Sequence, residues 1–239
     1  MVKKTSYIAL AVVFLFSSVF SQESRENNNQ SQLHHEIVVT ATRIETSTQE
    51  IASSVTVISR EELDRMKQAT VLEALEEILG LVIVQNGPAG GSGSVLIRGA
   101  NSEHTLILMD GVELNDPISP ARSSDLAHIT LENVDRIEIL RGPQSTLYGS
   151  DALSGVVNII TKKGQGGMKF SLSSAGGSYG TLINRAGLDG SVEKIHYSLG
   201  VSYFRSAGLS AASSDYEGNE EKDGYRNFSL SGRIGYRFS

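Results

Sequence analysis

Apolar residues alternate with small or polar ones along the C-terminal part of the chain. The alternation is regular over residues 195–203 and 228–238 and weaker over 168–175 and 181–188. Strands that are apolar on one side, small or charged on the other, and aromatic near their ends are typical of transmembrane β-strands. The connection at 191–194 is short, whereas the next one is long and polar, a rhythm typical of periplasmic turns and extracellular loops. A soluble antiparallel sheet would show the same alternation.

Two short helices are predicted upstream, each from a capping signal. Ser59 with Glu62 forms a capping box for a helix through Lys67, and Thr70 with Glu73 forms a second one. The second helix places its leucines and an isoleucine on one face and is expected to end at a glycine, the usual residue after a helix C-terminus. The apolar face is Leu72, Leu75, Ile78 and Leu79, and the expected end is Gly80.

Short β-prone runs surround these helices. A tight turn is predicted at Asp110-Gly111, because this dipeptide stands between two apolar runs. Helices and strands follow one another without a regular βαβ rhythm, so the pattern predicts an α+β domain and not a doubly wound sheet. The predicted strands are 55–58, 81–84 (of the buried type), 95–98, 105–109, 134–140 and 156–160.

The N-terminus reads as an export signal. Lys3 and Lys4 precede an apolar stretch over 7–20, and cleavage is expected between Ser21 and Gln22. The alternative is an uncleaved anchor, for which the apolar run is short. We therefore predict a signal peptide at 1–21. Export also favours the membrane interpretation of the C-terminal strands over a soluble sheet.

A polar linker follows at 22–50 and contains a short β-branched run, residues 37–43. An extended segment between two polar stretches has no local partner and is suited to pair with the sheet edge of another protein. The alternative is an ordinary first strand of the following domain.

Composition narrows the function classes. The 239 residues carry a net charge of −6 with no basic stripe, which argues against nucleic acid as the main partner. There is no cysteine, so disulfides and thiolate metal sites are excluded. The five histidines lack metal-ligand spacing, and neither a Ser/His/Asp set nor a phosphate-binding loop is present. We therefore expect that the protein is not an enzyme.

Five segments in order carry a family resemblance. The chain resembles the TonB-dependent outer-membrane receptors, and most closely their cobalamin (vitamin B12) transporters. The resemblance covers about residues 35–163 and implies an α+β plug domain over 51–163, followed over 164–239 by antiparallel transmembrane β-strands of an incomplete β-barrel. The segments are IVVTATR (37–43), LIRGAN (96–101), LMDGV (108–112), VDRIEILRGP (134–143) and YGSDALSGVVNIIT (148–161).

The resemblance implies energy-coupled uptake of a scarce nutrient across the outer membrane, without covalent chemistry. The periplasmic protein TonB would bind the segment 35–42, which is His35, Glu36, Ile37, Val38, Val39, Thr40, Ala41 and Thr42. Cobalamin would contact Ser92, Ser94, Asn101, Ser119 and Pro120.

Calcium is the one cofactor that the resemblance brings in, at Asp215, Glu217 and Asp223. Oxygen-rich clusters suit Ca²⁺, although this spacing is not that of an EF-hand and also fits a solvated charged loop.

Alternatives stay open for the cargo and for the architecture. The cargo could be an iron–siderophore or haem, and the chain could be a secreted binding or signalling module with a plug fold. Barrels of this family have about 22 strands. The 76 residues 164–239 are enough for about four, so a fragment, a truncated gene or a split receptor is expected. Four charged residues on or beside strands, Arg98, Arg136, Glu138 and Arg141, are expected to pair with one another or with the barrel interior.

Overall fold

The computed structural model describes residues 37–38, 46–47, 54–119, 121–210, 215 and 221–238. The predicted signal peptide and most of the predicted TonB-binding segment (His35, Glu36 and 39–42) lie outside these residues. The described part of the predicted TonB-binding segment is strand β1 (Ile37–Val38), which pairs antiparallel with β2 (Thr46–Ser47). Among the described residues, no helix is long and apolar enough to cross a membrane.

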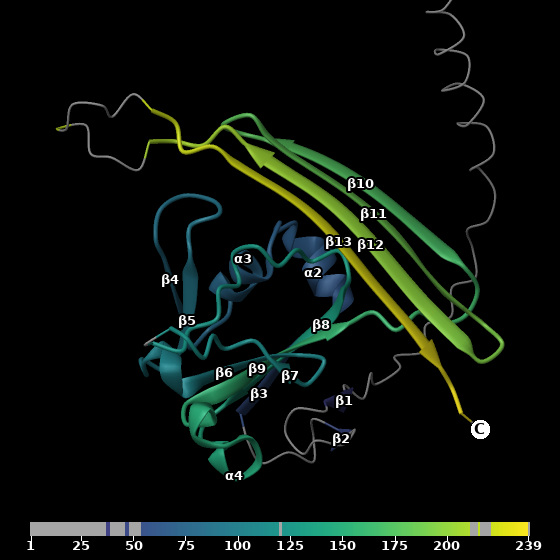
Figure 1. Cartoon of the computed structure of the whole chain (residues 1–239), viewed down its shortest axis with the longest axis horizontal. Helices are drawn as coiled ribbons and strands as arrows, with labels where there is room; N and C mark the ends of the chain where they lie inside the picture. Colours follow the sequence, from purple (N-terminus) through teal and green to yellow (C-terminus); the bar gives the residue numbers. More distant parts are fainter. Residues whose placement is uncertain are drawn as a thin grey trace, which may run out of the picture. The chain divides into compact units, whose positions relative to one another are not determined.

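Residues 54–161 form the predicted α+β domain, built on a mixed five-stranded sheet (Figure 1). The strand order is β3-β8-β9-β6-β7, in which β6 and β9 are parallel and the other pairs antiparallel. The elements are β3 (Ser54–Ile58), α2 (Arg60–Met66), α3 (Val71–Glu76), β4 (Leu81–Gln85), β5 (Gly93–Ile97), η2 (Ser102–His104), β6 (Thr105–Met109), β7 (Val112–Glu113), β8 (Val134–Arg141), α4 (Ser145–Tyr148), η3 (Ser150–Ala152) and β9 (Gly155–Thr161).

The larger apolar cluster of this domain lies between the helices and one face of the sheet, and a smaller one, with Leu106, Leu140 and Val156, lies on the other face. Burying aliphatic side chains of this size contributes about 1.5–3 kcal/mol each. The helix starts follow the predicted caps: Ser59 Oγ accepts from Glu62 N, and Ser59 N donates to the Glu62 carboxylate (2.8 Å). The packed residues include Leu63, Leu72 and Leu75 from the helices and Ile107, Ile137, Ile139 and Val157 from the sheet.

Three local predictions in this region are wrong: the end of the second helix, the burial of Leu79 and the burial of the strand that follows. The helix α3 ends at Glu76, not at Gly80, and Leu79 is 90% exposed instead of lying on the buried face. The chain leaves the helix through a tighter turn, in which Ile78 N donates to Leu75 O and Gly80 adopts a φ of +85°. The following strand β4 is half exposed, because it pairs only with β5 and no described element covers Val82 and Val84.

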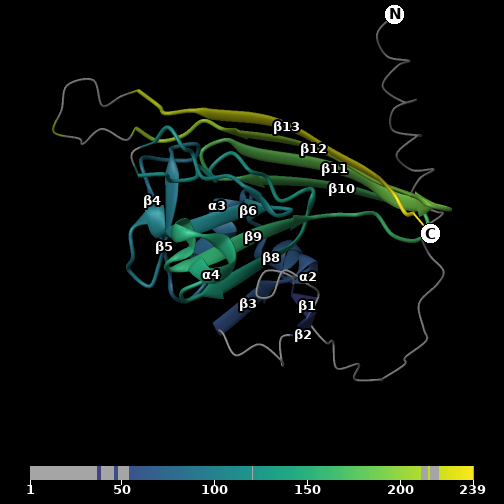
Figure 2. The same ribbon diagram turned by 60° about the horizontal axis from the view of Figure 1, so that its bottom comes forward.

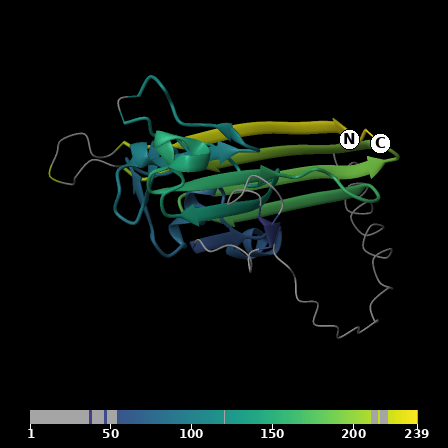
Figure 3. The ribbon, with the colours of Figure 1, turned by 90° about the horizontal axis from the view of Figure 1, so that it is seen from below.

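The last four described strands form a separate antiparallel sheet, here called the long sheet. Its strands are β10 (Lys169–Gly177), β11 (Thr181–Val192), β12 (Ile195–Ser206) and β13 (Tyr225–Tyr236), in sequence order. A two-residue turn joins β11 to β12, as predicted, and the long connection 207–224 joins β12 to β13. Figures 1 and 3 show the four strands running side by side.

The predicted alternation is confirmed on this sheet. One face presents exposed apolar side chains, and the other, inner face presents small and polar side chains to the α+β domain. The exposed residues include Phe170, Leu172, Leu199, Phe228, Leu230 and Ile234. On the inner face Ser198 and Ser202 are buried.

Candidate functional site between the α+β domain and the long sheet

The contact between the domain and the inner face of the long sheet is polar. Ser198 Oγ donates to Asn133 Oδ1 (2.6 Å), and Ser171 Oγ donates to Glu132 Oε1 (3.3 Å). Arg185 donates from Nη2 to the carbonyl of Gln68, between α2 and α3. Hydrogen bonds, and not apolar packing, therefore hold the centre of this contact.

Glycines on the inner face permit the close approach. A Cβ added at Gly187 would lie 2.4 Å from Glu132 Oε1 and 2.5 Å from Ser171 Oγ. A Cβ at Gly200 would lie 2.9 Å from Ser231 Oγ and 3.2 Å from Glu132 Cγ. The turn that precedes β8 can rest on the sheet because these side chains are absent.

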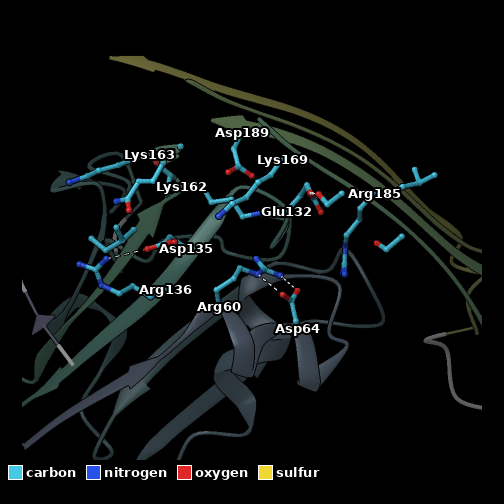
Figure 4. Close-up of a pocket in the computed structure, with 17 residues that line it drawn as sticks. Arg60, Asp64, Glu132, Asp135, Arg136, Lys162, Lys163, Lys169, Arg185 and Asp189 are labelled. Carbon is cyan, nitrogen blue, oxygen red and sulfur yellow. Dashed lines mark hydrogen bonds and ion pairs between the residues drawn. The ribbon is translucent and has the colours of Figure 1, made fainter. Parts of the chain in front are cut away.

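A charged cavity of about 560 Å³ lies beside this contact, between α2, the start of β8 and strands β10 and β11 (Figure 4). Arg60 donates from Nη1 to the carbonyls of Leu131 and Val134 (2.7 Å each) and also pairs with Asp64. The hydrogen bond from Arg60 lowers the pKa of the Asp64 carboxyl below its usual 3.8. The labelled lining residues are Arg60, Asp64, Glu132, Asp135, Arg136, Lys162, Lys163, Lys169, Arg185 and Asp189.

The expectation that strand charges pair with one another is confirmed for one pair. Arg136 bridges the fully buried Glu138 (2.9 Å) and Asp135 (3.2 Å). Arg141 behaves differently, since its guanidinium donates to Thr56 Oγ1 and to a backbone carbonyl (2.8 Å each). Burial, and then the neighbouring positive charge of Arg98, lower the pKa of Arg141.

A cluster of three residues, Asp110, Thr161 and Arg233, joins the domain to β13, and we call it the Asp110 latch. Asp110 pairs with Arg233 (3.1 Å) and accepts a hydrogen bond from Thr161 N (3.0 Å). Arg233 also donates to Thr161 Oγ1 (2.9 Å). The sequence assigned Asp110 only to the turn, which is present between β6 and β7, and Arg233 only to the polar face of its strand. Nothing local in the sequence linked two residues so far apart.

The predicted cargo-binding residues do not converge. Ser92 is exposed at the tip of the β4–β5 hairpin and Ser94 lies on β5, whereas Asn101 is exposed beyond the other end of β5. Ser119 is half-buried in a different loop, and Pro120 lies outside the described residues. No hydrogen bond joins any two of the four described residues, so a shared site at these positions stays a prediction.

The calcium site also stays a prediction. Asp215 is described and exposed, and Asp223 is described, but Glu217 lies outside the described residues. Within the described part of the chain, no group of three or more His, Asp or Glu side chains is placed to hold a metal ion.

Comparison with known families identifies the α+β domain. Residues 47–156 match the family model of the TonB-dependent receptor plug domain. This stretch makes up a little under half of the chain and includes most of the α+β domain. Proteins with this plug are outer-membrane receptors, which places the chain at the bacterial outer membrane.

Solved structures show the same arrangement of a plug domain and the strands after it. The siderophore receptor PirA from Acinetobacter baumannii is 27% identical over 77% of this chain, with a TM-score of 0.61. The ferric yersiniabactin uptake receptor FyuA from Yersinia pestis is 21% identical over 76% (TM-score 0.60), and the pyoverdine receptor FpvA from Pseudomonas aeruginosa is 20% identical over 72% (TM-score 0.61). The chain covers 29%, 28% and 25% of these three proteins, respectively.

Proposed function

We propose that the chain is the N-terminal part of an energy-coupled outer-membrane receptor whose cargo is an iron–siderophore chelate. The observation that carries the proposal is a plug domain resting on the polar inner face of a sheet whose other face is apolar and exposed. Such a sheet suits a position between lipid and a polar interior. The three solved structures named above are siderophore receptors, and this supports an iron chelate over the cobalamin that the sequence motifs favoured.

The polar contact between the plug and the long sheet suits a domain that must be displaced. When such a contact opens, its hydrogen bonds are replaced by hydrogen bonds to water, so the net cost is smaller than that of exposing an apolar surface of the same area. The cavity beside α2 already has the charged lining that hydration requires. A pull on the N-terminal segment would therefore meet contacts that water can replace one at a time.

TonB would supply this pull by pairing with residues 35–42. Strand addition shares the load over several backbone hydrogen bonds. Within this segment β1 already adopts strand pairing with β2. No covalent chemistry is involved, and the cargo is bound and released unchanged.

Cargo class is tested by binding to the receptor that contains this chain, purified in detergent. Ferric siderophores of different chelating chemistry and cyanocobalamin are titrated separately. We expect one of the ferric chelates to bind with a Kd at least about tenfold below that of cyanocobalamin, a difference of about 1.4 kcal/mol. Tighter binding of cyanocobalamin would refute the iron-chelate assignment.

Energy coupling is tested separately with Val38→Pro, because proline removes a backbone N–H needed for strand pairing. Val38→Ala is the matched control, since it shortens the same side chain and keeps the N–H. We expect Val38→Pro to bind the chelate normally and to lose uptake into cells, while Val38→Ala retains both. Normal uptake by Val38→Pro would contradict strand addition at this segment.

A further inference from the structure

The tip of the β4–β5 hairpin, residues 86–92, is ordered by its own hydrogen bonds. Asn86 N donates to Ser92 O (3.0 Å), and the side chain of Gln85 donates to the carbonyls of Pro88 (3.1 Å) and Gly91 (3.2 Å). These hydrogen bonds fix the shape of the tip, so its position relative to the long sheet depends on contacts from outside the loop. Figures 1 and 2 show the hairpin near the end of the long sheet where β13 begins.

One aromatic ring of the long sheet touches this tip. A Cβ added at Gly90 would lie 2.1 Å from Cδ2 and 2.4 Å from Cε2 of Tyr225, the first residue of β13. The ring thus lies directly against the backbone of Gly90, a contact that glycine alone permits. Gly90 also has a φ of +89°, which disfavours other residues.

Tyr225 is itself held on several sides. Its hydroxyl oxygen lies 2.8 Å from His128 Nδ1 and accepts from Asn227 Nδ2 (2.9 Å). The ring stacks on His128, with centroids 5.7 Å apart, and meets Phe204 edge-on at 5.2 Å. Since Asn227 also donates to the His128 carbonyl (3.2 Å), the plug segment and the strand are tied to each other independently of the hydroxyl.

The same plug segment reaches the hairpin from the other side. Asp125 Oδ1 accepts from the backbone N–H of Gly93 (3.3 Å), the first residue of β5, and from that of Ala127 (3.1 Å). Residues 125–128 therefore contact both the base of the loop and the ring that supports its tip. The hairpin loop, this segment and the start of β13 form one connected unit.

We propose that Tyr225 is a positioning residue that fixes the hairpin tip against the long sheet. The tip carries Ser92, and Ser94 follows it on β5, so the position that Tyr225 imposes sets how the hairpin meets the cargo. This consequence rests on the proposed function, whereas the positioning itself does not.

The test measures hydrogen exchange of the amides of residues 86–92 in the full chain. Tyr225→Phe keeps the ring and removes the hydroxyl, and Tyr203→Phe, on the opposite face of the same sheet, is the control. We expect Tyr225→Phe to raise exchange at the tip by about three- to tenfold, the range for losing one or two partly exposed hydrogen bonds. Exchange in β6 and β9 and the melting temperature should stay unchanged.

Two glycines of the loop allow the effect of the Tyr225 ring to be separated from the effect of backbone strain. Gly87 and Gly90 share a φ of +89°, but a Cβ at Gly87 would meet nothing within 4 Å. Both alanine substitutions therefore carry the same backbone strain, and only Gly90→Ala collides with Tyr225. We expect Gly90→Ala to accelerate exchange at the tip more than Gly87→Ala, and this excess to vanish in a Tyr225→Ala background.

The outcomes separate the two proposals. Wild-type exchange at the tip in Tyr225→Phe, or an excess for Gly90→Ala that persists without the Tyr225 ring, would overturn the positioning role. If exchange behaves as expected, chelate affinity should fall in Tyr225→Phe and not in Tyr203→Phe. If the wild-type receptor binds no ferric chelate, the proposed function fails while the exchange result still establishes the positioning role.

Discussion

The Asp110 latch gives the most direct prediction about how the plug is held. Asp110 has a φ of +50°, so an ordinary substitution would add backbone strain to the loss of charge. Asparagine tolerates this conformation and keeps a side-chain oxygen for Thr161 N. Asp110→Asn therefore removes the charge and replaces the oxygen that accepts from the Thr161 hydroxyl by an amide nitrogen, and Arg233→Gln removes the charge on the partner strand.

The magnitude follows from the geometry. The two charged groups are 3.1 Å apart, and the side chains of Asp110 and Arg233 are 31% and 30% exposed. Solvent screening at this exposure limits the pair to about 1 kcal/mol. Charge-assisted hydrogen bonds to Thr161 place the value at the upper end of what surface pairs contribute.

The assay is a double-mutant cycle on the full chain in detergent micelles. Unfolding free energies are obtained by denaturant titration of the wild type, both single variants and the double variant. We expect a coupling energy of about 1 kcal/mol that shrinks in ~1 M salt, where the screening length is about 3 Å. Additivity within about 0.3 kcal/mol would refute the reasoning, because the two residues would then act independently.

Two further predictions concern the plug contact and its acid response. Gly187→Ala places a methyl group against the Glu132 carboxylate and should lower the free energy of unfolding by about 1–3 kcal/mol. Gly232→Ala is the control and should be nearly neutral, because the nearest atom to its added Cβ would lie 3.6 Å away. Equal shifts of the two variants in the denaturant midpoint would contradict the close approach at Gly187. Asp64→Asn should cost about 0.3–0.5 kcal/mol at neutral pH. Because Arg60 lowers the pKa of Asp64 in the folded protein, this stabilisation is fully present above pH 3.8 and is lost as the pH falls through the lowered pKa. A difference in stability between wild type and Asp64→Asn that persists in stronger acid would count against the pair.

Local chemistry explains the elements that the sequence predicted well. The Ser59 capping box and the Asp110-Gly111 turn depend on neighbouring residues, and both are present. The end of α3 was misplaced because the apolar pattern continues through Leu79, while the chain turns away to reach β4. The exposure of β4 was also missed, since an apolar strand pattern does not show whether another element covers it.

The candidate site was less accessible from the sequence than the fold. Motif positions indicated Ser92, Ser94 and Asn101, and β5 separates the first from the last of these. The contacts that join the plug to the long sheet involve residues about 100 positions apart, such as His128 and Tyr225. Neither residue carries a local signal for its partner.

The sequence by itself determined where the longer strands run, which face of the C-terminal strands is apolar, and where α2 and α3 begin, because these depend on periodicity and on neighbours within a few residues. The two-residue strands β2 and β7 have no such pattern and were not predicted. Only the tertiary structure decided the strand order with its parallel β6–β9 pair, the Asp110 latch and the contact of Tyr225 with Gly90. Their physical basis is close approach between distant segments, where the absence of a side chain at one position makes room for a ring or a carboxylate from another.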